Sequence, residues 1–138
     1  MPIRRVPPQD AKALLDGEGY AYVDVRSIPE FEAGHPEGAY NIPVAHAGPR
    51  GMAPNPDFVS VVEANFGRDA KLVLGCRSGG RSLQAAQVLQ SAGFLNLVDQ
   101  RAGFEGAGAE PVWRPQGLPT ARTAAPGRDY AALETKGR

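Results

Sequence analysis

The chain of 138 residues has one cysteine, two histidines and no excess of either charge. A single cysteine cannot form an internal disulfide, which excludes a disulfide-stapled secreted scaffold. Fifteen Lys and Arg balance fifteen Asp and Glu, so the broad positive field typical of nucleic-acid-binding domains is missing. No apolar run has the length of a membrane span or of a signal-peptide core. We therefore expect a cytoplasmic protein without nucleic-acid or membrane partners.

The scarcity of histidine and cysteine also limits the chemistry. No cluster of His, Cys and acidic residues has the spacing of a metal site, so we expect no metal and no cofactor. His35 and His46 are the only histidines, and neither is close in sequence to the one cysteine, Cys76. A hydrolytic Cys-His enzyme is therefore disfavoured. Because there is no second thiol, any sulfur loaded onto Cys76 must leave to an external acceptor.

Strand-like and helix-like segments alternate along the chain. The apolar run 71–75 is typical of a strand buried on both faces, and residues 82–92 place Leu and Ala on one face of a helix. This alternation predicts an α/β domain with a mostly parallel sheet. The other expected strands are 20–25, 39–42 and 94–98; the other expected helices are 9–16, 27–34 and 55–66, the last capped by Asn55; and residues 45–54 are expected to form a loop.

The turn after the apolar strand is the most informative segment. Cys76 comes at the C-terminal end of that strand, where ligands bind in open parallel sheets. Gly79 and Gly80 let backbone amides fold inward as an anion-binding nest, and the next helix directs the positive end of its dipole at the sulfur. Arg77 and Arg81 add positive charge. These features favour a thiolate and would hold an anion or an anionic persulfide, although a lone cysteine can also be a small buried apolar residue.

Two segments resemble motifs of the rhodanese-type sulfurtransferases. The loop from Cys76 to Ser82, Cys-Arg-Ser-Gly-Gly-Arg-Ser, is similar to the family's active-site loop. Asp24-Val-Arg26, followed by Glu30-Phe, looks like the family's first strand and the turn after it.

Two further segments carry the same resemblance. Residues 34–43, Gly-His-Pro-Glu-Gly-Ala-Tyr-Asn-Ile-Pro, are similar to the family signature Gly-His-Ile-x-Gly-Ala-x-Asn-Ile-Pro. Trp113, with Gly-Leu-Pro at 117–119, looks like the family's C-terminal ending, whereas Ala102-Gly103 departs from its usual Gly-Gly. The matches come in family order. The resemblance implies a rhodanese-like domain over residues 1–120, with a five-stranded, mostly parallel sheet flanked by helices on both faces, and a C-terminal tail over 121–138 that is partly disordered or docked.

The resemblance also implies an activity of the thiosulfate sulfurtransferase class. Cys76 would take a sulfane sulfur from thiosulfate or a related small anionic donor, form a persulfide, and pass the sulfur to cyanide, a thiol or a protein acceptor. Asp24, Arg26 and Glu30 would brace the loop, and a pair of Arg26 with Glu30 would have ordinary four-residue helical spacing. We expect a monomer or weak dimer. The residues implied to bind substrate are Arg77, Ser78, Gly79, Gly80, Arg81 and Ser82.

Two other functions remain open at this point. One is a persulfide carrier, or a module that senses sulfur or redox state, with low turnover of small molecules. The other is a cysteine phosphatase or arsenate reductase, whose loop has the pattern Cys-x5-Arg. Here Arg81 comes one residue earlier, and a shorter nest suits one sulfur better than a tetrahedral phosphate.

Overall fold

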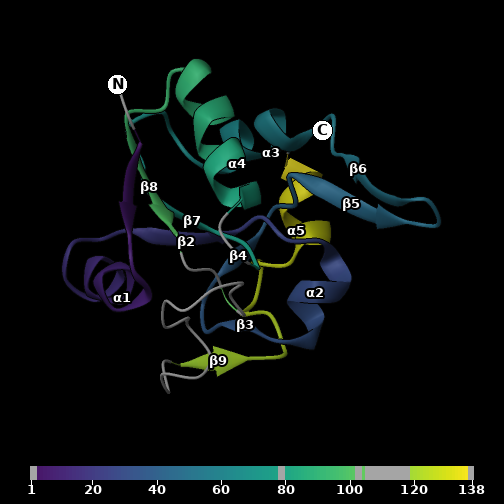
Figure 1. Ribbon diagram of the computed structural model, residues 1–138, viewed down its shortest axis with the longest axis horizontal. Coiled ribbons are helices and arrows are strands. Elements are labelled where there is room, and N and C mark those ends of the chain that lie inside the picture. The colour runs from purple at the N-terminus through teal and green to yellow at the C-terminus, as the bar shows by residue number, and fades with distance from the viewer. Residues whose placement is uncertain (1–2, 78–79, 102–103, 105–118, 137–138) are drawn as a thin grey trace.

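A five-stranded parallel sheet runs through the centre of the computed structural model, which describes residues 3–77, 80–101, 104 and 119–136 (Figure 1). The sheet confirms the predicted fold class. Its strand order is β1-β8-β7-β2-β4, with every neighbouring pair parallel. The strands are β1 (Arg4–Val6), β2 (Ala21–Asp24), β4 (Tyr40–Asn41), β7 (Lys71–Gly75) and β8 (Asn96–Gln100).

Helices cover both faces of this sheet, and the period-two alternation of the strands decides which residues meet them. Leu72 and Leu74 of β7 belong to one apolar cluster with residues of α3, α4 and α5. Val73 points to the other face and packs in a second cluster with α1 and with Phe31 of α2. The helices are α1 (Pro8–Gly17), α2 (Ile28–Ala33), α3 (Phe58–Asn65), α4 (Gly80–Ser91) and α5 (Tyr130–Lys136).

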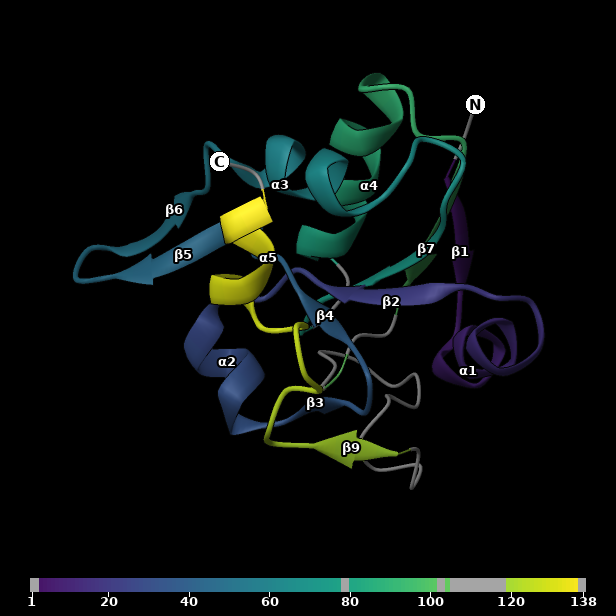
Figure 2. The same ribbon diagram turned by 180° about the vertical axis from the view of Figure 1, so that it is seen from behind.

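Two short antiparallel pairs complete the fold. β3 (His35–Pro36) pairs with β9 (Thr120–Ala121). β5 (Ala45–Gly48) and β6 (Gly51–Pro54) form a hairpin that projects from the body of the domain (Figures 1 and 2). The prediction of a loop over 45–54 is therefore wrong. Ala, Gly and Pro have low strand propensity, and the pairing of the two arms, not their composition, makes these residues strands.

The C-terminal segment contacts the domain core through α5. Tyr130 and Leu133 are buried in the cluster that contains α3 and α4. The side-chain amide of Asn55 donates to the Tyr130 hydroxyl at 3.1 Å and to the backbone oxygen of Pro43 at 2.9 Å. Asn55 was expected to cap α3, but Asp57 precedes that helix. Asn55 instead joins α5 to the chain after β4.

Gly75, the residue before Cys76, has no room for a side chain. A Cβ atom there would lie 1.7 Å from the hydroxyl oxygen of Tyr22, which is buried on the neighbouring strand. We expect Gly75→Ala to lower the free energy of unfolding by about 3 kcal/mol, because the Tyr22 ring must move in a packed interior. Urea denaturation measures the loss.

Gly17→Ala is the matched control for that substitution, because nothing lies within 4 Å of a Cβ at Gly17. We expect it to change stability by less than about 0.5 kcal/mol. Equal stability of the two variants would contradict the close approach of Tyr22 to Gly75.

Within the described residues, no helix has the length and apolar character that a bilayer crossing requires.

Candidate active site

Cys76 lies between two neighbouring central strands from which the chain continues in opposite directions across the sheet. It follows β7, which leads through α4 to β8, while the adjacent β2 leads through α2 to β4. Such a point at the carboxyl ends of parallel strands is where open α/β sheets bind ligands. Only 1% of Cys76 is exposed, and its backbone oxygen accepts a hydrogen bond from the amide of Phe104 at 2.8 Å. The thiol is thus held in a fixed place at this edge.

The first turn of α4 approaches the sulfur directly. The Cys76 thiol donates to the Ser82 hydroxyl, with 3.5 Å between Sγ and Oγ. Ser82 is the third residue of α4 and is fully buried. The first turn of α4 therefore lies against the sulfur, where the positive end of a helix dipole favours an anion.

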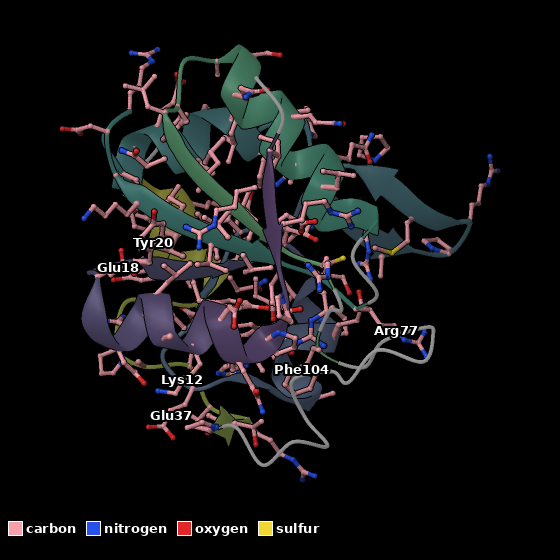
Figure 3. All side chains as sticks on the ribbon, turned by 60° about the vertical axis from the view of Figure 1, so that its left-hand side comes forward. Lys12, Glu18, Tyr20, Glu37, Arg77 and Phe104 are labelled. Atoms are coloured by element: carbon pink, nitrogen blue, oxygen red, sulfur yellow. The ribbon has the colours of Figure 1, made fainter. Side chains whose placement is uncertain are left out.

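The remaining loop residues divide into described and undescribed positions. Gly80 begins α4 and is exposed. Arg77 is also exposed, and Figure 3 shows it on the outer part of the loop, directed away from the domain. Ser78 and Gly79 lie outside the described residues, so their expected part in an anion nest stays a prediction.

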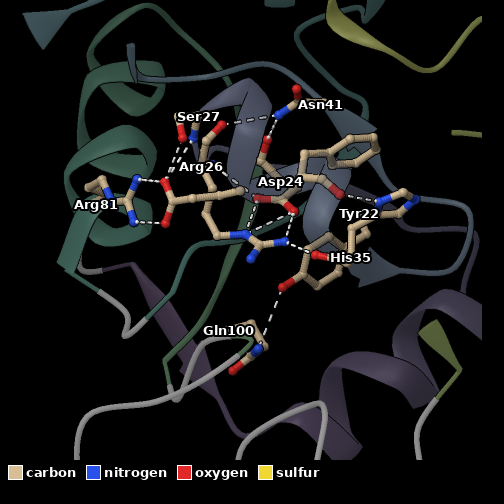
Figure 4. A network of polar contacts seen from close by, with 11 residues as sticks. Tyr22, Asp24, Arg26, Ser27, His35, Asn41, Arg81 and Gln100 are labelled. Atoms are coloured by element: carbon tan, nitrogen blue, oxygen red, sulfur yellow. Dashed lines mark hydrogen bonds and ion pairs between the residues drawn. The ribbon is translucent and has the colours of Figure 1, made fainter. Parts of the chain in front are cut away.

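Arg81 turns to Glu30 in a two-point ion pair. Its two terminal nitrogens donate to the two carboxylate oxygens at 2.8 and 2.9 Å (Figure 4). Glu30 also closes a capping box at the start of α2, accepting from the amide and hydroxyl of Ser27. A pair of Glu30 with Arg26 was considered from their spacing, but the structure joins Glu30 to Arg81, 51 residues away.

Glu30 and Arg81 each stabilise the charged form of the other. Burial alone would raise the pKa of Glu30, but hydrogen bonds from Arg81 and Ser27 outweigh it and lower the pKa to about 2. The hydrogen bond to Glu30 likewise raises the pKa of Arg81, against the effect of burial. The two side chains stay charged in neutral and mildly acidic solution, and they tie the first turn of α4 to α2.

Arg26 pairs instead with Asp24 in the interior. The Arg26 guanidinium contacts both carboxylate oxygens of Asp24 at 2.7 to 3.1 Å, donates to the Gly34 backbone oxygen at 2.6 Å and lies 4.6 Å from the Phe104 ring centre. The Asn41 amide joins this group by donating to the backbone oxygens of Asp24 and Arg26 (Figure 4). These contacts fit a bracing role beside the loop, and that role remains a prediction.

Asp99 and Arg5 complete the site, and the sequence analysis missed both. The Ser82 hydroxyl donates to one carboxylate oxygen of Asp99, and Arg5 Nε donates to the other at 2.7 Å. Asp99 is fully buried, and burial raises its pKa despite the hydrogen bonds from Ser82 and Arg5, which lower it. Asp99 follows an apolar run at a strand end, as Asp24 does, and that shared pattern could have identified it.

Comparison with known proteins decides the family. The model of the family described as "Rhodanese-like domain" matches residues 7–110. The chain belongs to the rhodanese-like domain family. It is 41% identical over 102 residues to "Thiosulfate sulfurtransferase 16, chloroplastic" of Arabidopsis thaliana, covering 74% of this chain and 80% of that protein. It is 36% identical to "Thiosulfate sulfurtransferase 18" of the same plant, over 72% of this chain and 74% of that protein.

A longer relative and a solved crystal structure are also similar to this chain. "Senescence-associated protein DIN1" of Raphanus sativus is 38% identical over 72% of this chain, and this chain spans about half of it, 54%. The crystal structure of Rv0390 from M. tuberculosis superposes with a TM-score of 0.75 at 27% identity, covering 89% of this chain and all of that one. This superposition extends the shared fold beyond the residues that the family model matches.

The rhodanese-like site brings together most of the residues selected from sequence. Cys76 and Ser82 are in contact, Arg81 and Glu30 are paired, and Asp24 with Arg26 lies on the adjacent strand end. Neither histidine serves as a partner for the cysteine in the described contacts. His35 stacks on Phe31 and hydrogen-bonds to its backbone oxygen.

Proposed function

We propose that this protein is a sulfurtransferase that moves a sulfane sulfur from thiosulfate, or a related anionic donor, to cyanide or a thiol through a persulfide on Cys76. The observation that carries the proposal is the place of Cys76, at the carboxyl end of β7 and against the first turn of α4. Membership of the rhodanese-like family and the names of the two thiosulfate sulfurtransferases among its relatives support the same class.

The two steps balance without a cofactor or an oxidant. The Cys76 thiolate attacks the outer sulfur of thiosulfate, the bond between the two sulfurs breaks, and sulfite leaves with the electron pair. The product is a Cys76 persulfide anion. Cyanide then attacks the outer sulfur, the persulfide bond breaks, and thiocyanate leaves while Cys76 returns to a thiolate. The helix dipole of α4 stabilises the anion in each intermediate state.

The direct test of this proposal is the production of thiocyanate from thiosulfate and cyanide. Purified protein should form thiocyanate and sulfite in equal amounts, at a rate proportional to protein concentration. A rate equal to that without protein would overturn the proposed small-molecule reaction. Turnover of p-nitrophenyl phosphate by the same sample would instead favour the phosphatase reading.

Charge near the loop should set the affinity for thiosulfate. Glu30 neutralises Arg81 and repels a dianion, so we expect Glu30→Gln to lower the KM for thiosulfate about fivefold at low ionic strength, which corresponds to roughly 1 kcal/mol. Glu32→Gln is the matched control, because Glu32 is an exposed acid on the same helix. Steady-state kinetics in dilute buffer measure both variants. An unchanged KM in Glu30→Gln would contradict a thiosulfate site beside Arg81.

The Glu30–Arg81 pair also favours a second candidate, a persulfide carrier. A guanidinium already held by a carboxylate attracts small dianions less strongly than an unpaired one. A carrier would transfer sulfur faster to a protein thiol than to cyanide, and a comparison of the two rates separates the candidates.

A further inference from the structure

Sulfur transfer by Cys76 requires that the thiol lose its proton, and the usual histidine partner is not beside it. The His35 ring hydrogen-bonds to the backbone of α2. The ring centres of His46 and Tyr130 lie 5.5 Å apart. Within the described residues, the Cys76 thiol donates a hydrogen bond to the Ser82 hydroxyl. This hydrogen bond offers the Cys76 proton a first step toward Ser82.

The hydrogen bonds continue from Ser82 into the domain. The thiol donates to Ser82 Oγ, and the single hydroxyl proton of Ser82 is directed to Asp99. Asp99 is buried completely, and its second oxygen is held by Arg5, its partner in the register of β1 and β8. A hydroxyl between an acid and a carboxylate can accept one proton while it donates another. Cys76, Ser82 and Asp99 thus form a continuous path for a proton.

The surroundings favour moving negative charge from Asp99 to the sulfur. At Asp99 the charge is removed from water, and among the described residues Arg5 of β1 is the full positive charge that opposes that cost. At Cys76 the charge meets the N-terminal end of α4. The other nearby charges are paired: Asp24 with Arg26 beside β2, and Glu30 with Arg81 between α2 and α4.

Tyr22, also on β2, does not supply a competing charge. Burial raises its pKa far above the ordinary value, so the phenol is neutral throughout the working range of pH. The exposed Arg77 follows Cys76 directly in the chain and lies on the outer part of the loop (Figure 3).

We propose that Asp99 accepts the proton of Cys76 through Ser82, so that the site with one shared proton exists as a thiolate beside a protonated Asp99. The thiol proton passes to Ser82 Oγ as the Ser82 proton passes to Asp99. Afterwards the protonated Asp99 donates to Ser82, and Ser82 donates to the thiolate. No net charge is created. The inference rests on the proposed function only in taking Cys76 as the nucleophile.

The pH profile of Cys76 alkylation by iodoacetamide tests this relay. A shared proton gives a thiolate fraction that is constant over the pH range in which the pair holds one proton. Wild-type protein should therefore show a plateau of alkylation rate below neutral pH. In Asp99→Asn the rate should rise about tenfold per pH unit, because the thiol then loses its proton to solvent. At pH 6 we expect Asp99→Asn to react at least about tenfold more slowly than wild type, and at pH 9 within about twofold.

Three more variants keep the test decisive if Asp99→Asn does not fold. Ser82→Ala removes the intermediate hydroxyl and should abolish the plateau, and Ser82→Thr should restore it. Arg5→Gln removes the positive charge that opposes protonation of Asp99, so its plateau should be higher than that of wild type. Faster alkylation of Asp99→Asn at low pH, or an equal slowing at every pH, would overturn the relay and leave Asp99 a structural residue.

Failure of the relay is distinguishable from failure of the proposed function. Alkylation reports on the thiolate whether or not sulfur is transferred. A plateau in wild-type protein that forms no thiocyanate would support the relay and overturn the proposed reaction. Thiocyanate production by a protein without a plateau would do the reverse.

Discussion

Replacement of Cys76 by serine is expected to remove sulfur transfer while leaving the domain folded. The hydroxyl is smaller than the thiol and polar like the Ser82 group it contacts, so the buried position accepts it. An alcohol is not ionised at neutral pH and does not form a persulfide, because the nucleophile must be a thiolate. We expect the rate of thiocyanate formation to fall by at least about 10³-fold, as is usual when a covalent nucleophile is removed.

Thiocyanate assays on matched samples of wild type and Cys76→Ser measure this loss. Thermal unfolding of both samples serves as the control, and the two melting curves should nearly coincide. Because Cys76 is the one thiol in the chain, no other residue can replace it as the sulfur carrier. Residual activity above a tenth of the wild-type rate would contradict a Cys76 persulfide.

Loss of the Asp24 charge is expected to produce the largest change in stability. Asp24 and Arg26 are both nearly inaccessible to water, with 1% and 2% of each residue exposed. Asp24→Asn keeps the shape of the side chain but leaves the Arg26 guanidinium buried without its countercharge. Removing one partner of a buried pair costs about 3–5 kcal/mol. We expect a loss in that range by urea denaturation.

The exposed pair of Arg68 with Glu63 gives the comparison for that result. Their side chains are 64% and 38% exposed, and pairs of this kind contribute less than about 1 kcal/mol. Glu63→Gln should therefore change the free energy of unfolding by only a few tenths of a kcal/mol. Similar losses in Asp24→Asn and Glu63→Gln would show that the Asp24–Arg26 pair does not stabilise the strand end that faces the loop.

The elements best predicted from the sequence are those whose own residues show the apolar pattern of a strand or helix. Lys71–Gly75 forms a strand with the expected bounds, because a short continuous apolar run between polar residues suits a strand buried on both faces. β1 was not predicted, since it consists of two arginines and a valine and becomes a strand only by pairing with β8. The missed strand had a consequence for the site, because it carries Arg5.

The site likewise has features that depend on neighbouring residues in the chain and features that depend on distant ones. The place of Cys76 between a strand and a helix could be predicted because it depends on residues next to it in the chain. The pairing of Arg81 with Glu30 joins residues 51 positions apart in the chain, and that of Ser82 with Asp99 joins residues 17 positions apart. The sequence contains all four side chains but does not indicate which of them meet. Only the packing of α4 against α2 and β8 decides that.

The most direct test of the central claim is the intact mass of the protein after incubation with thiosulfate and removal of the excess. We expect one added sulfur per chain, about 32 Da, that is lost on treatment with cyanide and does not appear in Cys76→Ser. The wild-type protein would regain its original mass as thiocyanate is released. An unchanged mass after thiosulfate would contradict the persulfide account, as would an added sulfur that persists in Cys76→Ser.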